Sequence, residues 1–167
     1  MAISFIKRSI FKVNEQPQLT ISRKNFFMSD YNLQRFIDAQ RSDYATALEE
    51  ITAGKKRGHW MWYIFPQLLG LGYTSTSVTY SIKDLDEAAA YLRDPVLGVR
   101  LVEICNALLK LDNNDAHKIF GSPDDLKLRS SMTLFSLVPG ADKIFQQVLD
   151  KFFGGRKDEK TLQLLNL

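Results

Sequence analysis

The chain has 167 residues, 22 of them basic and 19 acidic, so its formal net charge is only +3. Such a length suits one domain with its own hydrophobic core, and so small a charge excess does not imply nucleic-acid binding. A single cysteine, Cys105, excludes a disulfide framework. No apolar run approaches the roughly 20 residues of a membrane-spanning helix, so no membrane association is expected.

Residues 1–29 form an N-terminal extension rich in lysine, arginine, serine and phenylalanine, with Glu15 as its single acid. This composition leaves open a transit peptide or a membrane-surface arm, although its apolar residues form no continuous signal-peptide core. Met28 is followed at once by a regular helical pattern and reads as a second chain start. We predict that 1–29 is a weakly ordered appendage and that residues 30–167 form a single α-helical domain.

The first predicted helix runs from Leu33 to Ile51, because apolar residues recur there at spacings of three and four, and Gly54 ends it. The next segment, "GKKRGHWMWYIFPQ" at 54–67, is too short and too aromatic to assign by periodicity. We expect it to be a largely buried loop that Pro66 ends. The run "GLGYTSTS" at 70–77 also predicts a loop, since glycines and small hydroxyls disfavour helix.

Three capping patterns mark the helices that follow. Asp84 and the Asp94-Pro95 pair start helices that end near residues 91 and 111, and Cys105 lies on the apolar stripe of the second, where we expect a buried, unreactive thiol. A short helix covers 116–120, and Ser122 caps the next, with Pro123 in its first turn. Further helices cover 139–154 and the last residues. The fold class is therefore all-α, a compact bundle of about six helices with one long aromatic loop segment.

The basic residues at 55–57 lie at a helix end, where cations are favoured by the helix dipole, and this alone explains them. Their continuity with Trp60 and Trp62 allows a second interpretation, because fixed positive charge beside flat rings suits a phosphate joined to an aromatic ring. Against this, aromatic residues at such spacing more often belong to the core than to a ligand site, and this holds for Trp60. His59 is either a helix cap or a neutral, ligand-facing imidazole. The amide of Gln67 either pins a loop or contacts a ligand.

The helix that begins at Ser122 carries the second group of polar residues. Asp124, Lys127 and Ser131 share one face, and Asp125 and Arg129 are spaced as a pair on the adjacent strip. Each acid–base pair is also compatible with simple surface support. Ser130 and Thr133 lie on an apolar strip, where hydroxyls usually bond back to their own helix or permit close packing.

None of the strong catalytic or metal-binding motifs is present, and the chain has only two histidines, His59 and His117. We therefore expect no metal and no cofactor. His117 lies in a short amphipathic helix, where a solvated or structural role is expected rather than ligand binding.

Five segments nevertheless resemble one family. They are "NLQRFIDAQ", "GKKRGHWMWYIFPQLLGLG", "YLRDPVLGVRL", "IFGSPDDLKLRSSMTLF" and "FFGGRKDEKTLQLL", in the same order over residues 30–167. The family is widespread and mainly bacterial, its domains are of unknown function, and some members carry the label calpastatin. The resemblance implies an α-helical, cytoplasmic domain without a known cofactor, and it implies no activity. Because nothing here is similar to the inhibitory repeats of true calpastatin, protease inhibition is not expected.

The family's motif positions fall on the following residues: Lys56, His59, Trp60, Trp62, Phe65, Pro66, Gln67, Asp125, Lys127, Arg129, Ser130, Ser131 and Thr133. Gly58 stands where a serine is common in the family.

Our leading hypothesis is that segment 55–67 and the helix after Ser122 meet in one pocket for a small anionic ligand, phosphorylated or nucleotide-like. The candidate ligand-binding residues are Lys56, Lys127 and Arg129 for negative charge, Trp60 and Trp62 for a ring, and Gln67 and Ser131 for orientation. His59 and Asp125 are the candidate catalytic pair for proton transfer, if a metal-independent reaction occurs. Two alternatives stay open, namely a protein-interaction module with an exposed aromatic belt and a purely structural role. The oligomeric state is not predicted.

Overall fold

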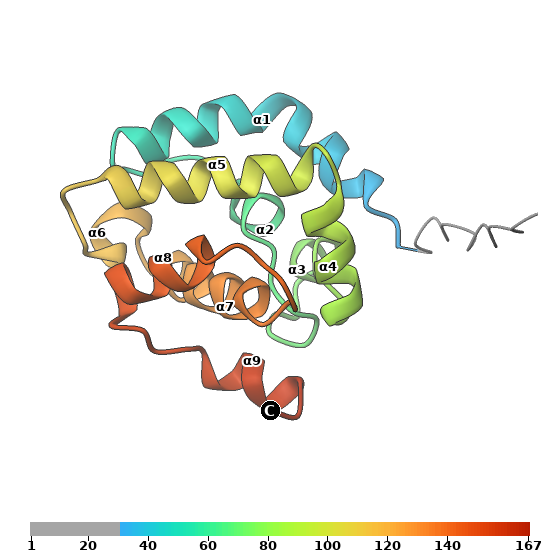
Figure 1. The fold of residues 1–167 in the computed structure, drawn as a ribbon. Coiled ribbons are helices and arrows are strands. Elements are labelled where there is room, and N and C mark those ends of the chain that lie inside the picture. The colour runs from blue at the N-terminus through green and yellow to red at the C-terminus, as the bar shows by residue number, and fades with distance from the viewer. Residues whose placement is uncertain (1–30) are drawn as a thin grey trace, which may run out of the picture.

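A computed structural model describes residues 31–167, which form nine helices and no strand (Figure 1). The helices are α1 (Gln34–Thr52), α2 (Met61–Ile64), α3 (Ser75–Thr79), α4 (Leu85–Arg93), α5 (Leu97–Lys110), α6 (Ala116–Phe120), α7 (Asp124–Ser136), α8 (Ile144–Phe153) and α9 (Glu159–Leu164). The predicted all-α class is confirmed. The expected extension at 1–29 lies outside the described residues.

The bundle has α7 at its centre. Helices α1 and α5 lie side by side along one edge, α7 and α8 pack together beneath α5, and α9 lies against α7 on the opposite side (Figure 1). Every residue of α7 from Ser130 to Phe135 is buried. Its hydroxyls bond back to the helix, from Ser130 to the carbonyl of Leu126 at 3.1 Å and from Thr133 to that of Arg129 at 2.8 Å. The predicted role of these two hydroxyls is therefore confirmed, and it lets a polar sequence occupy the core.

The structure contains two short helices that the sequence does not predict, α2 and α3. Helix α2 forms a single turn inside the segment expected to be an aromatic loop. Helix α3 lies within the predicted loop 70–77 and beyond it, where the Thr74 side chain caps it by accepting the N–H of Ser77 at 3.1 Å. A hydroxyl that disfavours a helix interior thus stabilises a helix start.

The predicted caps are correct in two places and wrong in one. Asp84 accepts the N–H of Glu87 at 2.8 Å, and Asp94 accepts that of Leu97 at 3.0 Å. Ser122, however, does not cap α7, which begins at Asp124 without a side-chain cap. The first turn is instead held by main-chain carbonyls and by Asp125, whose carboxylate accepts the N–H of Leu126 at 2.9 Å.

Cys105 is fully buried, and burial followed by the charge of Asp142 raises the pKa of its thiol far above the ordinary value. None of the described helices combines the length and apolarity needed to pass through a bilayer.

Candidate functional site

Glu50, near the end of α1, holds the segment that leads into α2. One of its carboxylate oxygens accepts the main-chain N–H groups of Arg57 at 2.7 Å and Gly58 at 2.9 Å, together with the indole N–H of Trp60 at 2.9 Å. Burial raises the pKa of Glu50, but these three bonds outweigh it, so the pKa lies below its ordinary value. The loop after α1 is therefore fixed by a carboxylate that the sequence did not single out.

Trp60 belongs to the core. Its side chain is buried, with 2 % exposure, and it packs beside Phe65, with ring centroids 6.3 Å apart. Because its N–H is bound by Glu50 and its ring is enclosed, Trp60 cannot stack on a ligand in this conformation. Of the two interpretations of Trp60, the structure supports a place in the core.

Two lysines from distant parts of the chain meet on one carboxylate. The ammonium of Lys56 lies 2.6 Å from Oδ2 of Asp124, and that of Lys127 lies 2.7 Å from Oδ1 of the same side chain. Lys56 also donates to the carbonyl oxygen of Gly58 at 2.6 Å. The segment after α1 and the first turns of α7 therefore do meet, and Asp124 joins them.

Each lysine of this cluster also lies over an indole ring. The ammonium of Lys56 is 4.9 Å from the ring centroid of Trp60, and that of Lys127 is 4.5 Å from the ring centroid of Trp62. At such distances the ring quadrupole attracts the cation. We call Lys56, Asp124, Lys127 and Trp62 the lysine cluster.

The lysine cluster lies in a partly buried place, with side-chain exposures of 7 % for Lys56, 18 % for Asp124 and 21 % for Lys127. The charge of Lys56 acts on two carboxylates, those of Asp124 and Glu50, whereas the more exposed Lys127 pairs with Asp124 alone. Burial raises the pKa of Asp124, but the hydrogen bonds and charges of Lys127 and Lys56 outweigh it and hold the pKa below its ordinary value. The carboxylate therefore stays ionised at neutral pH.

The predicted catalytic pair is not formed in this structure. Asp125 lies 3.1 Å from Nδ1 of His117, and no hydrogen bond or ion pair joins it to His59 among the described residues. His59 is exposed on the loop before α2. The adjacent position of Asp124 and Asp125 explains the outcome, because on a helix consecutive side chains point in different directions. Asp124 points to Lys56 and Lys127, and Asp125 points to His117 on α6.

Arg129 does not join the two lysines either. Its Nη2 lies 3.4 Å from Oδ1 of Asp158, at the start of α9, and the spacing-based pair with Asp125 is not formed. The spacing on the helix therefore indicates the wrong partner for Arg129. Its structural contact is with the C-terminal segment.

Gln67 is half-buried and Ser131 is fully buried. The main-chain carbonyl oxygen of Gln67, not its side-chain amide, accepts the N–H of Ile82 at 2.8 Å and pins the loop after α2. Ser131 is fully buried one turn beyond Lys127, and its Oγ has no hydrogen-bond partner among the described residues. An unpaired buried hydroxyl is costly, so Ser131 stands out on the face of α7 that carries Lys127.

Two surface cavities, of about 650 and 730 Å³, lie elsewhere in the described domain. The first is between α4, α5 and the loop before α8, and the second is between α1 and α5. None of the predicted site residues lines either cavity. The lysine cluster is therefore a partly exposed surface feature rather than the wall of either hollow.

Fold and cluster together define an all-α domain in which two lysines share one aspartate, in a partly buried place beside a tryptophan. The chain belongs to the family described as "Protein of unknown function (DUF1810)", which it matches over residues 30–165. The family resemblance seen in the sequence is thereby confirmed.

A solved relative is the conserved hypothetical protein Rv1873 from Mycobacterium tuberculosis. It is 46 % identical, with a TM-score of 0.80, over 82 % of this chain and 98 % of that chain. No curated protein matches the chain.

Proposed function

We propose that this domain binds a small anionic molecule at the lysine cluster. The observation that carries the proposal is the partly exposed ammonium of Lys127, which lies 4.5 Å from the ring centroid of Trp62 and shares the Asp124 carboxylate with Lys56, at 2.7 and 2.6 Å. Charges that are partly removed from water act on a ligand more strongly than charges in bulk solvent.

The parts of the cluster differ in their access to solvent. Lys56 is nearly enclosed, whereas Lys127 is 21 % exposed and Trp62 is half-buried. Lys127 and Trp62 therefore form the ligand-facing part, and Lys56 holds Asp124 from the inner side. The exposed Arg57 adds positive charge on the adjoining loop. The phosphate of a ligand pairs with Lys127, and the apolar part of the ligand lies against Trp62.

No reaction follows from this arrangement. Proton transfer by His59 and Asp125 stays a prediction, and in the conformation described Asp125 serves His117. Binding is the function that the geometry supports best. A location in the cytoplasm likewise stays a prediction from the family resemblance.

The alternative of a protein-interaction module gains little from the aromatic segment, because Trp60 is enclosed. Among the described residues, the exposed large apolar side chains that are close in sequence to the aromatic segment or to Lys127 are those of Leu69, Tyr73, Val78 and Leu126, and none of them is a tryptophan. Docking through an exposed tryptophan belt is therefore not favoured.

Thermal unfolding in the presence of candidate ligands tests the proposal. The probes are inorganic phosphate, adenosine monophosphate and glucose 6-phosphate, because a ligand bound only by the folded state raises the melting temperature through mass action. We expect a concentration-dependent rise for at least one probe, accompanied by a change in tryptophan fluorescence. Lys127→Ala should abolish the ligand-induced rise, measured relative to the variant's own unliganded melting temperature.

Lys160→Ala is the matched control, since Lys160 is exposed on α9 and makes no ion pair within the described residues. It should respond to ligand as the wild type does. The absence of a response to all three probes in the wild type, or an equal response in Lys127→Ala, would refute binding at the cluster.

A further inference from the structure

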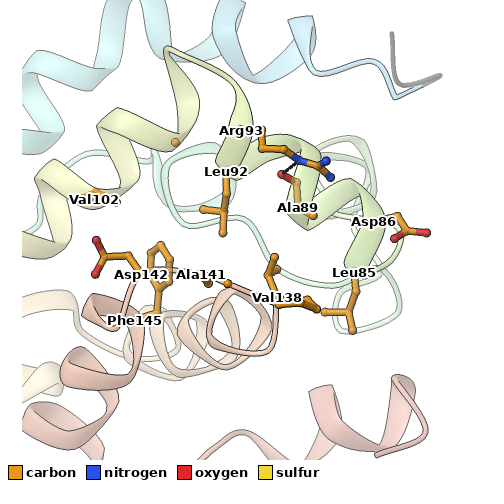
Figure 2. A pocket seen from close by; sticks show the side chains of 13 residues that line it. Leu85, Asp86, Ala89, Leu92, Arg93, Val102, Val138, Ala141, Asp142 and Phe145 are labelled. Carbon is orange, nitrogen blue, oxygen red and sulfur yellow. Dashed lines mark hydrogen bonds between the residues drawn. The ribbon is translucent and has the colours of Figure 1, made fainter. Parts of the chain in front are cut away.

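The cavity between α4, α5 and the loop that joins α7 to α8 shares no residue with the lysine cluster. It measures about 650 Å³, within the range of sites that hold small molecules (Figure 2). Its position makes it independent of the function proposed above.

The surface of this cavity is mainly apolar at its centre. Figure 2 shows the side chains of Leu92, Val138, Ala141 and Phe145 gathered around the hollow. Phe145 is fully buried beneath it, whereas Leu92 and Ala141 are only partly buried. An apolar group placed there would cover these side chains and gain free energy from the water it displaces.

The charged residues of the cavity lie at its rim and are unequally distributed. Asp142 lies on one side, whereas Asp86 and Arg93 both lie on α4 at the other side (Figure 2). Asp86 and Arg93 are two turns apart and form no ion pair with one another, and Arg93 donates its Nε–H to the carbonyl oxygen of Ala89 at 3.0 Å. With two carboxylates and one guanidinium, the lining has a formal charge of −1.

The Asp142 carboxylate is exposed to solvent, with a single hydrogen bond from the described residues. Its Oδ1 accepts the main-chain N–H of Ile144 at 2.9 Å, and no ion pair involves Asp142 within residues 31–167. Its charge also acts on the protein interior, where it raises the pKa of Cys105 after the larger effect of burial. A carboxylate without a cation, at the edge of an apolar hollow, favours a ligand with the opposite charge.

We propose that this cavity binds a small apolar amine, whose ammonium pairs with Asp142 and whose hydrocarbon or aromatic body lies on Leu92, Val138 and Phe145. The recognition has two parts, a charge-assisted hydrogen bond to Oδ2 of Asp142 and burial of the apolar body. An apolar acid is disfavoured, because the lining has two carboxylates against one guanidinium and Arg93 is bonded to the carbonyl oxygen of Ala89 on its own helix.

Three probes of nearly equal size separate the two parts. They are 2-phenylethylamine, 2-phenylethanol and 3-phenylpropionate, each titrated into the full chain and followed by amide chemical shifts in two-dimensional NMR. We expect the amine to shift the amide signals of Gly98, Gly140 and Ala141. Its affinity should be about tenfold higher than that of the alcohol, and the difference in affinity from the acid should be larger still. Tryptophan fluorescence should not change, because neither tryptophan lines this cavity.

The decisive variant is Asp142→Asn, which keeps an oxygen to accept the Ile144 N–H and removes the charge. It should lower the affinity for the amine to that for the alcohol. Asp112→Asn is the control, since Asp112 is exposed in the loop between α5 and α6. A second variant, Ala89→Phe, fills the hollow and should weaken both amine and alcohol.

The inference is overturned by any of three results. These are no shift with any probe, equal affinities for amine and alcohol in the wild type, or an amine affinity that Asp142→Asn leaves unchanged. Amide shifts confined to residues outside the cavity also overturn the inference.

Discussion

Removing the Glu50 carboxylate should loosen the loop that positions Lys56 and Trp60. Glu50→Ala deletes the acceptor of three N–H groups, those of Arg57, Gly58 and the Trp60 indole. The indole is enclosed, so its N–H is left without a partner, which costs about 1–3 kcal/mol. The two main-chain groups are nearer to solvent and recover part of their bonding from water. We expect a total loss of about 2–4 kcal/mol in the free energy of unfolding.

Glu50→Gln separates the charge from the bonds. The oxygen that accepts all three N–H groups at 2.7, 2.9 and 2.9 Å can be replaced by the amide oxygen, so only the charge-assisted part is lost. We expect a loss of about 1 kcal/mol. Glu49→Ala, next to it on α1 and exposed, is the control and should change stability by less than about 0.5 kcal/mol.

Urea unfolding followed by far-ultraviolet circular dichroism measures these differences, provided that the slope with denaturant is unchanged. Because the folded pKa of Glu50 lies below its ordinary value of 4.5, its ionised form stabilises the fold above that pH. This contribution is lost as the pH falls through the folded pKa, so wild type and Glu50→Gln should converge in acid. Equal stability of Glu50→Ala and Glu49→Ala at neutral pH would refute the reasoning.

Three further predictions concern the packing of the domain. Gly98→Ala should destabilise the fold by more than about 3 kcal/mol, because an added Cβ would lie 2.1 Å from the carbonyl oxygen of Leu92; a melting temperature within a few degrees of wild type would contradict this. Asp158→Ala removes the acceptor of the Thr161 N–H at 3.0 Å and hydroxyl at 2.8 Å, so it should cost about 1–3 kcal/mol and expose the C-terminal helix to limited proteolysis. The Cys105 thiol should react with a thiol reagent only after unfolding, since it is fully buried and its pKa is raised; rapid modification of the native protein would count against this.

The helical fold could be predicted because its long helices repeat apolar residues over several turns, as α1 and α5 do. Helices α2 and α3, of four and five residues, are too short to give a period, and their formation depends on a cap and on neighbouring contacts.

Less of the candidate site than of the helical fold could be predicted from the sequence. Lys127 and Asp124 are one turn apart on a helix, so their pairing follows from spacing. The contact of Lys56 with the same carboxylate depends on how α7 packs against the loop after α1, and no local pattern reports this. For the same reason the spacing on α7, which pairs Arg129 with Asp125, does not predict the contact of Arg129 with Asp158. Glu50 gave no signal beyond its place near a helix end.

The Asp124 carboxylate already pairs with the lysines of the proposed site, so a ligand needs enough negative charge to displace it. Asp124 is tethered beside Lys127, so it competes as though it were present at a very high local concentration. A singly charged anion would not displace the Asp124 carboxylate from Lys127, because it has no more charge than the carboxylate already there. Dianions such as phosphate monoesters would displace Asp124, whereas abundant monoanions such as chloride or acetate would not bind.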